Sequence, residues 1–166
     1  GPVVPDGLVQ EADALQRGDV WQAAAAELSV RWPPKPLLFD DVNTVSLVLR
    51  VRWQDRELWL MGDALALQER DLLDLGDPGK GLPHRLLKVG HHGSKSASDA
   101  AWVAALRPEA ALVPAGKRNA FGFPHAATLD TLQTRGCRQV WVAGPASGVR
   151  LEALPDGEWK AETGAD

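Results

Sequence analysis

The sequence predicts an α/β domain, a mixed sheet with helices on one face. Two observations support this class. Its first half shows the apolar alternation of strands, and its second half alternates strands with short helices. Composition agrees, because 45% hydrophobic and 24% charged residues in a 166-residue chain are typical of one globular domain. The net charge of −4 excludes a wholly basic, histone-like nucleic-acid binder, although a local basic patch remains possible.

The chain divides into three parts. Residues 1–18 are interpreted as an expression scar, beginning Gly1-Pro2, followed by a poorly defined lead-in. Residues 19–154 carry the periodic segments and form the predicted domain, and residues 155–166 are predicted to be a polar tail that frays. No apolar run approaches the roughly 18 residues that a membrane-spanning helix needs.

Strands dominate the first half. Residues 28–32 alternate and predict a strand, while residues 23–26 before it are either a helical turn or a loop. The strongest strand signal covers residues 46–53, and residues 57–61 return as the second strand of a hairpin. The alternation in residues 46–53 predicts one apolar face, made of Leu47, Leu49, Val51 and Trp53. The other face carries Arg50 and Arg52 and is expected to be in contact with solvent.

Helices and strands alternate in the second half. The predicted helices are residues 64–75, 99–106 (with Ser98 as N-cap) and 128–134, and the predicted strands are residues 85–89, 110–114, 139–142 and, at the end, 148–154. Such an order is typical of parallel strands joined by crossing helices.

Polar side chains follow several of these strands directly. Asp63 follows the hairpin, His91 and His92 follow residues 85–89, and His125 lies beyond residues 110–114. The ends of neighbouring strands meet at one edge of a sheet, where ligands commonly bind. Imidazole and carboxylate groups suit zinc, manganese or iron, and a carboxylate can bridge two ions in a hydrolase.

Simpler interpretations of these residues stay open. An Asp after Gly at a strand end is more typical of a turn or a helix N-cap than of a ligand. One histidine of a pair can hold the other in position instead of binding metal, and His125 alone fits an ordinary loop. Lysines and arginines are usually solvated surface charges, although Lys95 lies on a Gly-Ser loop that could present N–H groups to an anion.

Four segments together resemble the C-terminal metallo-β-lactamase-like domain of the ComEC family. They are Asn43 with residues 46–49, then residues 61–63, residues 87–95 and residues 116–125. Members of this family are bacterial competence proteins that carry transforming DNA through the inner membrane. The resemblance extends over residues 19–154, and the Leu-Lys-Val-Gly-His-His-Gly-Ser-Lys block is its most specific part.

The resemblance implies an αββα sandwich with a two-metal site, holding Mn or Zn, that hydrolyses phosphodiesters of the DNA strand that is not imported. Asp63, His91 and His92 would be metal ligands, and His92, Lys95 and His125 catalytic groups. The implied DNA contacts, for single- or double-stranded DNA, are Lys95, Lys117, Arg118 and Asn119. The domain would be soluble, outward-facing or periplasmic, and attached to the transmembrane part of its parent protein.

Two departures from the family pattern shape the expectation. The family's first metal motif, His-x-Asp-x-Asp-His, is absent because no histidine precedes His84, so the chain resembles the second half of the sandwich. We therefore expect weak or absent metal and no activity in this chain alone. The family's Gly-His-Pro-His loop is Gly122-Phe123-Pro124-His125 here, with a phenyl ring in place of an imidazole.

Two other functions compete with an enzyme part. The domain could guide DNA without chemistry, using the cations Lys95, Lys117 and Arg118 with exposed Trp rings, or it could be purely structural. A missing partner half would also leave the apolar stripe of residues 46–53 uncovered. We expect that stripe to be covered by a homodimer or by residues 1–40 folding back over it.

Overall fold

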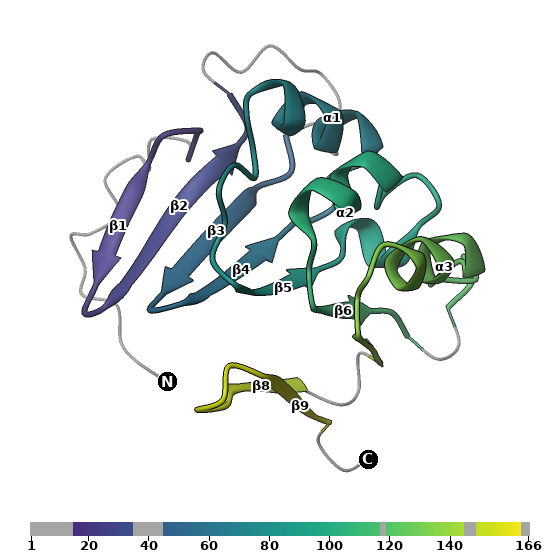
Figure 1. Ribbon diagram of the computed structural model, residues 1–166. Helices are drawn as coiled ribbons and strands as arrows, with labels where there is room; N and C mark the ends of the chain where they lie inside the picture. Colours follow the sequence, from purple (N-terminus) through teal and green to yellow (C-terminus); the bar gives the residue numbers. More distant parts are fainter. Residues whose placement is uncertain (1–14, 35–44, 117–118, 145–148, 164–166) are drawn as a thin grey trace, which may run out of the picture.

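The computed structural model describes residues 15–34, 45–116, 119–144 and 149–163. Within them a seven-stranded sheet carries helices on one face and a separate two-stranded hairpin on the other (Figure 1). This arrangement confirms the predicted α/β class with a mixed sheet. The strands are β1 (Val20–Ala23), β2 (Ala26–Trp32), β3 (Val48–Trp53), β4 (Arg56–Leu60), β5 (His84–Lys88), β6 (Ala110–Pro114), β7 (Gln139–Ala143), β8 (Val149–Ala153) and β9 (Trp159–Thr163), and the helices are α1 (Ala66–Asp74), α2 (Ala100–Leu106), α3 (Ala126–Thr134) and the short 3-10 helix η1 (Gly90–Gly93).

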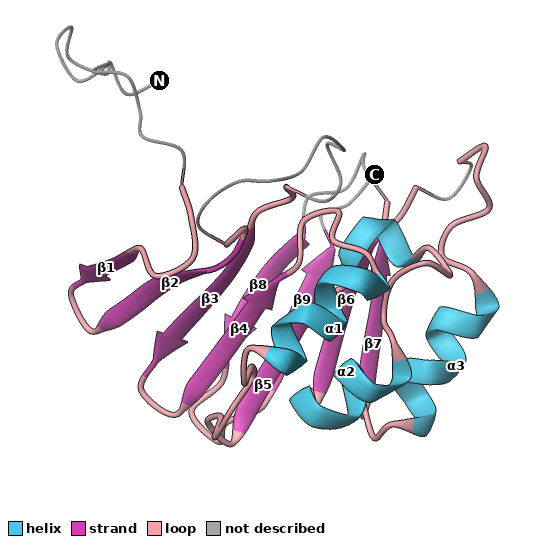
Figure 2. Ribbon diagram, turned by 90° about the horizontal axis from the view of Figure 1, so that it is seen from above, coloured by secondary structure: helices cyan, strands magenta, loops and turns pink. Residues whose placement is uncertain are grey.

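Strand order in the large sheet follows the sequence from β1 to β7. β1 to β4 form an antiparallel meander, and β4 to β7 run parallel. α1, α2 and α3 each connect two successive parallel strands and lie on the same face, while β1 extends beyond them (Figure 2). The carboxyl ends of β4, β5 and β6 therefore meet at one edge of the sheet.

The core lies between the sheet and the helices. Trp59 of β4 meets Trp102 of α2 edge to face, with ring centroids 5.2 Å apart and planes at 80°. Such pairs add to the stabilisation that comes from the apolar area they bury. The fully buried side chains around them include Met61, Leu72, Leu87, Leu106 and Leu132.

The prediction that the Arg50 and Arg52 face of β3 is in contact with solvent is wrong. Arg50 is the cross-strand neighbour of buried Trp59, so it lies on the helix-covered face, with its guanidinium 5.9 Å from the indole centroid. Arg52 lies on the same face, and its Nε donates to buried Glu57 at 3.0 Å. A guanidinium can stack on an aromatic ring and pair with a carboxylate, so both arginines are accommodated on the face that the period-2 pattern assigns to solvent.

The opposite face of the sheet is covered in part by the β8–β9 hairpin (Figure 1). The predicted fraying of residues 155–166 is wrong over residues 159–163, because β9 pairs with β8 along its length. Arg56 donates to the carbonyl of Leu154, and Gly157 packs so closely on the His84 ring that a Cβ there would lie 2.2 Å from it. Leu86 and Ala110 on this face are buried.

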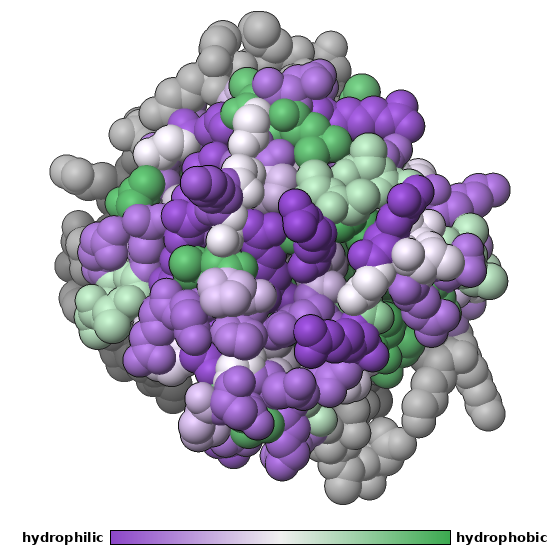
Figure 3. All heavy atoms as spheres, in the orientation of Figure 1, coloured by the Kyte–Doolittle hydropathy of each residue, from purple (hydrophilic) through white to green (hydrophobic). Residues whose placement is uncertain are grey.

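Coverage of this face ends before β3. Leu49 and Val51 are half-buried and Trp53 is 39% exposed. β2 pairs beside β3 within the sheet instead of lying over its apolar stripe, so the described residues 15–34 do not fold back over that stripe. Homodimerisation through the stripe stays a prediction. The molecular surface seen in Figure 3 is mostly polar, with apolar side chains in small separate areas.

Local signals misplace three boundaries. Of the two alternatives for residues 23–26, the loop holds and the helical turn does not, because Ala23 and Ala26 close the β1–β2 turn, and the strand begins at Ala26 instead of Leu28. α1 begins at Ala66 after Leu65, so Asp63 is not its N-cap. Asp99 caps α2 in place of Ser98, accepting a hydrogen bond from the Ala101 N–H at 2.9 Å.

A buried carboxylate joins α1 to the start of α2. Glu69 is 1% exposed, and its oxygens accept hydrogen bonds from the backbone N–H groups of Ser98 at 2.9 Å and Asp99 at 2.6 Å. Desolvation by burial is the largest effect on this group and raises the pKa of Glu69 to about 7, against the opposing effect of these hydrogen bonds.

Protein stability is therefore expected to fall as the pH rises through 7. The folded pKa of Glu69 lies above the unfolded value, so folding favours the protonated form, and the added stability present below about pH 4.5 is lost by about pH 8. A shift of this size corresponds to roughly 3 kcal/mol of unfolding free energy. Urea unfolding between pH 5 and pH 8 measures the slope. Glu69→Gln should flatten the slope and the exposed control Glu152→Gln should keep it, whereas an unchanged slope in Glu69→Gln would contradict the assignment.

Candidate functional site at the carboxyl ends of β4 and β5

Two short loops form the site, one after β4 and one after β5. The carbonyl of Gly62 accepts two hydrogen bonds, from the His91 N–H at 3.1 Å and from Lys88 Nζ at 3.0 Å. This shared acceptor fixes the loop that carries Asp63 against the loop that carries the histidine pair. Burial lowers the pKa of Lys88, and the nearby Asp63 carboxylate opposes that shift.

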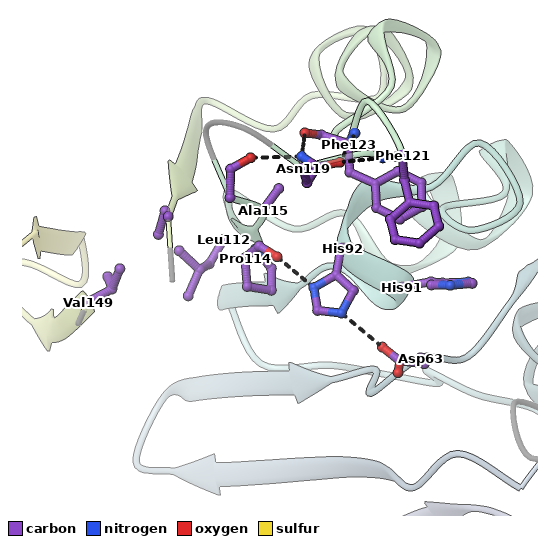
Figure 4. Close-up of a pocket in the computed structure, with 13 residues that line it drawn as sticks. Asp63, His91, His92, Leu112, Pro114, Ala115, Asn119, Phe121, Phe123 and Val149 are labelled. Atoms are coloured by element: carbon purple, nitrogen blue, oxygen red, sulfur yellow. Dashed lines mark hydrogen bonds and ion pairs between the residues drawn. The ribbon is translucent and has the colours of Figure 1, made fainter. Parts of the chain in front are cut away.

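His92 is held between a backbone carbonyl and a carboxylate. Its Nδ1 lies 2.7 Å from the carbonyl oxygen of Pro114, and its Nε2 lies 3.7 Å from Oδ1 of Asp63 (Figure 4). Because a carbonyl only accepts, Nδ1 carries the hydrogen and, in the neutral ring, Nε2 keeps its lone pair. The 3.7 Å separation exceeds a hydrogen bond, so Asp63 and His92 can both contact a third group.

His91 and His92 both adopt left-handed backbone conformations, with φ of 43° and 55°. Non-glycine residues pay roughly 1 to 2 kcal/mol for this region, and such strain is concentrated at functional sites. The Nδ1 atom of His91 is buried and has no hydrogen-bond partner among the described residues. A buried nitrogen without a partner is an observation that a ligand would explain.

The donor types fit a divalent metal. Imidazole nitrogen and carboxylate oxygen are zinc and manganese ligands, and a His ligand commonly donates its other ring N–H to a carbonyl, as His92 does. Among the described residues, however, no three His, Cys, Asp or Glu side chains are grouped closely enough to hold an ion. Of the predicted ligands, Asp63 and His92 approach each other, and a metal site that also includes His91 stays a prediction.

A cavity of about 850 Å³ opens beside these residues (Figure 4). Phe121 and Phe123 line it with their rings stacked, centroids 5.4 Å apart and planes at 19°. His92 continues the near-parallel arrangement, 6.5 Å from Phe123 at 16°. Phe121 is 73% exposed. The sequence indicated Phe123 only as the replacement of an imidazole and did not single out Phe121, although two Phe residues in a Gly-containing loop are a usable signal.

Asn119 lies at this cavity, but its amide is used within its own loop. Nδ2 donates to the carbonyls of Gly116 and Phe123, both at 2.7 Å, and Oδ1 accepts from the N–H groups of Phe121 at 3.2 Å and Phe123 at 2.8 Å. Asn119 therefore holds the loop that carries Phe121 and Phe123 in its conformation. Its expected contact with DNA stays a prediction.

Among the described residues, neither His125 nor Lys95 is one of those that line the cavity. His125 is the N-cap of α3, and its Nδ1 accepts a hydrogen bond from the Lys95 N–H at 3.0 Å. The two residues connect neighbouring loops, and Lys95 lines a separate shallow hollow with Arg70. Lys117 and Arg118 lie outside the described residues. The catalytic roles expected for Lys95 and His125 thus stay predictions, and the geometry brings together Asp63, His91 and His92.

Comparison with known proteins finds relatives but no matching family model. The chain is 32% identical to ComE operon protein 3 of Bacillus subtilis over 152 residues, 30% identical to competence protein ComA of Neisseria gonorrhoeae over 118 residues, and 36% identical to recombination protein 2 of Haemophilus influenzae over 91 residues. These alignments cover 82%, 71% and 54% of the chain, but only 19%, 17% and 11% of the relatives.

The chain therefore spans about a fifth or less of the curated relatives it matches. Among its described residues, no helix is both long and apolar enough to cross a bilayer. The similarities support a relationship to bacterial competence proteins.

Proposed function

Since the chain is related to a segment of bacterial competence proteins, we propose that it is a DNA-handling domain of such a protein. The parent would take up DNA through the inner membrane, with this domain on the outer face and joined to the transmembrane part. The observation that carries the proposal is the cavity in which Asp63 and His92 approach each other beside stacked phenyl rings.

The reaction we propose is hydrolysis of phosphodiesters in the strand that is not imported. Asp63, His91 and His92 would contribute to holding one or two divalent ions, Mn or Zn. Such ions would lower the pKa of a bound water and neutralise phosphate charge. Pro114 orients His92 through its carbonyl, and the Gly62 carbonyl keeps the Asp63 loop in place. Because the donor set is partial, the parent protein would have to supply further ligands.

The aromatic side of the cavity favours unstacked bases. Phe121 and Phe123 present near-parallel ring faces next to the metal-type donors, and every base can stack on such a face. A duplex keeps its bases paired and stacked, so this surface supports single-stranded DNA as the preferred ligand. The same rings favour a second candidate function, a DNA guide without chemistry, because a phenyl ring replaces the imidazole expected at residue 123.

Phe121→Ala tests the DNA-handling proposal. We expect the dissociation constant for a labelled 12-nucleotide single strand to rise roughly 5- to 100-fold, because one base–aromatic stack is worth about 1 to 3 kcal/mol. Fluorescence anisotropy at two salt concentrations measures the affinity. Trp53→Ala removes another exposed aromatic ring, away from the cavity, and should leave the affinity unchanged. Equal losses in both variants, or none in Phe121→Ala, would refute the stacking surface.

A further inference from the structure

A second cavity, of about 380 Å³, lies where β5 begins, at the end opposite the histidine pair. Five strand residues separate the two ends, roughly 17 Å of chain. Arg85 is next to Glu57 in the β4–β5 register and belongs to the helix-covered face, so this cavity is separate from the Asp63 site. Its lining residues are Gly79, Lys80, Gly81, Leu82, Pro83, Arg85, Ala105 and Arg107.

Its charge is entirely positive. Lys80, Arg85 and Arg107 line the cavity, and no carboxylate does. The adjacent Glu57 is fully buried, and its oxygens contact Arg52, Arg85 and the Trp59 Nε1–H, so its carboxylate is already paired and does not line the cavity. Three cations gathered in a chain whose net charge is −4 make this a local exception to the overall balance.

The loop from Gly79 to Gly81 adds backbone donors to this positive wall. None of its three N–H groups donates a hydrogen bond to a described residue. The Arg85 guanidinium packs against Gly81, 1.2 Å from where a Cβ would be, so a side chain at residue 81 would displace it. Successive free N–H groups in such a turn are a common way for a protein to bind an anion.

Arg107 occupies a position that normally takes glycine. It is the C-cap of α2 with φ 49° and ψ 57°, the left-handed conformation in which Gly is strongly preferred. The last carbonyls of α2 do not repel an anion strongly, because Arg85 donates to the Leu106 carbonyl and the Arg107 N–H donates to that of Val103. An exposed arginine held in a strained conformation beside two other cations lacks a structural reason.

Glu57 compensates the charge of Arg85 in part, whereas no carboxylate lines the cavity beside Lys80 and Arg107. Burial lowers the pKa of Arg85, Glu57 opposes this shift, and Arg107 adds to the lowering. The guanidinium of Arg85 already donates to the carbonyls of Leu106 and Gly79, so it shapes the wall of the cavity. The side chains of Lys80 and Arg107 have no hydrogen-bond or ion-pair partner among the described residues.

We propose that this cavity binds a phosphate group, held by Lys80, Arg107 and the N–H groups of residues 79–81. The phosphate could belong to a mononucleotide or to a nucleic-acid backbone, and both present the same charged oxygens. The proposal does not depend on hydrolysis at Asp63, because the two cavities share no lining residue.

Arg107→Gly is a discriminating variant because it removes the charge and relieves the left-handed strain. We expect the melting temperature to stay equal or rise, and the affinity for inorganic pyrophosphate to fall roughly fivefold or more, as for loss of a charge-assisted contact. Lys80→Gln should weaken binding similarly. The matched control Arg135→Gln, at the exposed C-cap of α3, should bind as the unmodified chain does.

Amide chemical shifts in an NMR titration with pyrophosphate, followed by a mononucleotide and a short single strand, locate and compare the ligands. Perturbations centred on residues 79–81 support the site. Tighter binding of the oligonucleotide then assigns the phosphate to a DNA backbone, and equal affinity assigns it to a single phosphate compound. Unaltered affinity in both cavity variants, an equal loss in Arg135→Gln, or perturbations confined to other residues would overturn the proposal.

Discussion

Replacing Asp63 with Ala in a longer protein that contains this domain is expected to lower DNA hydrolysis by about 100-fold or more, because metal-assisted attack depends on the ligands that hold the ion. His92→Ala should have a comparable effect, since its Nε2 lies 3.7 Å from the Asp63 carboxylate and the two side chains would serve one ion. The double variant should be little worse than either single variant, because groups that act as a unit are not additive.

The measurement is release of labelled nucleotides from a linear DNA in the presence of manganese. Asp130→Ala is the matched control, because this carboxylate is exposed on α3 and outside the cavity. The isolated chain is expected to hold metal weakly and to be inactive. Full activity in Asp63→Ala would show that hydrolysis does not depend on this site and would leave the DNA guide as the function of the domain. Stoichiometric, chelator-resistant metal in the chain alone would mean that its donor set is complete.

Gly93→Ala is expected to destabilise the chain by roughly 2 to 5 kcal/mol, the sum of a left-handed backbone penalty and an overpacked contact. Gly93 has φ of +78°, and a Cβ there would lie 2.7 Å from Pro124 Cβ and 2.8 Å from Val113 Cγ1. Its carbonyl also accepts the His125 N–H at 3.0 Å. Any shift that relieves the clash therefore displaces the loop of His91 and His92 together with the loop of Phe121 and Phe123.

Urea unfolding gives the loss of stability, and the histidine ring signals in NMR report the displaced loop. Gly136→Ala is the control, because Gly136 has φ of +97° with no atom within 4 Å of its added Cβ. It should show the backbone penalty alone, about 1 kcal/mol. If both variants lost the same stability, packing around Gly93 would not be what holds the loops in place.

The sequence predicted the parallel half of the fold well because each element there has a local signal. The apolar strand that ends at Lys88, the apolar face of α2 and Gly136 after α3 are all visible in a few consecutive residues. The face of β3 could not be assigned in this way. Its arginines point towards Trp59 and Glu57, partners that become neighbours only after strands pair. β9 was missed because its pairing with β8 compensates for a polar composition.

The candidate site, like the fold, could be predicted only where a local signal or a general rule of sheet topology applies. That Asp63 and the histidine pair approach each other follows from the rule that parallel strands end at one edge. The separate position of Lys95 and His125 could not be foreseen, because it depends on two left-handed residues that turn the chain immediately after β5. Phe121 carries no periodic signal, and its exposure becomes visible only when the Asn119 amide shapes the loop.

The sequential order of β1 to β7 bears on how the molecule assembles. No strand of the large sheet must be inserted between two strands that precede it in the chain. Each new strand can dock on the edge left by the previous one, so a chain emerging from the ribosome can extend its sheet from the amino end as synthesis proceeds. Each strand pairs with the strand that precedes it in the chain, so the cost of closing each loop is lower than for strands further apart in the sequence.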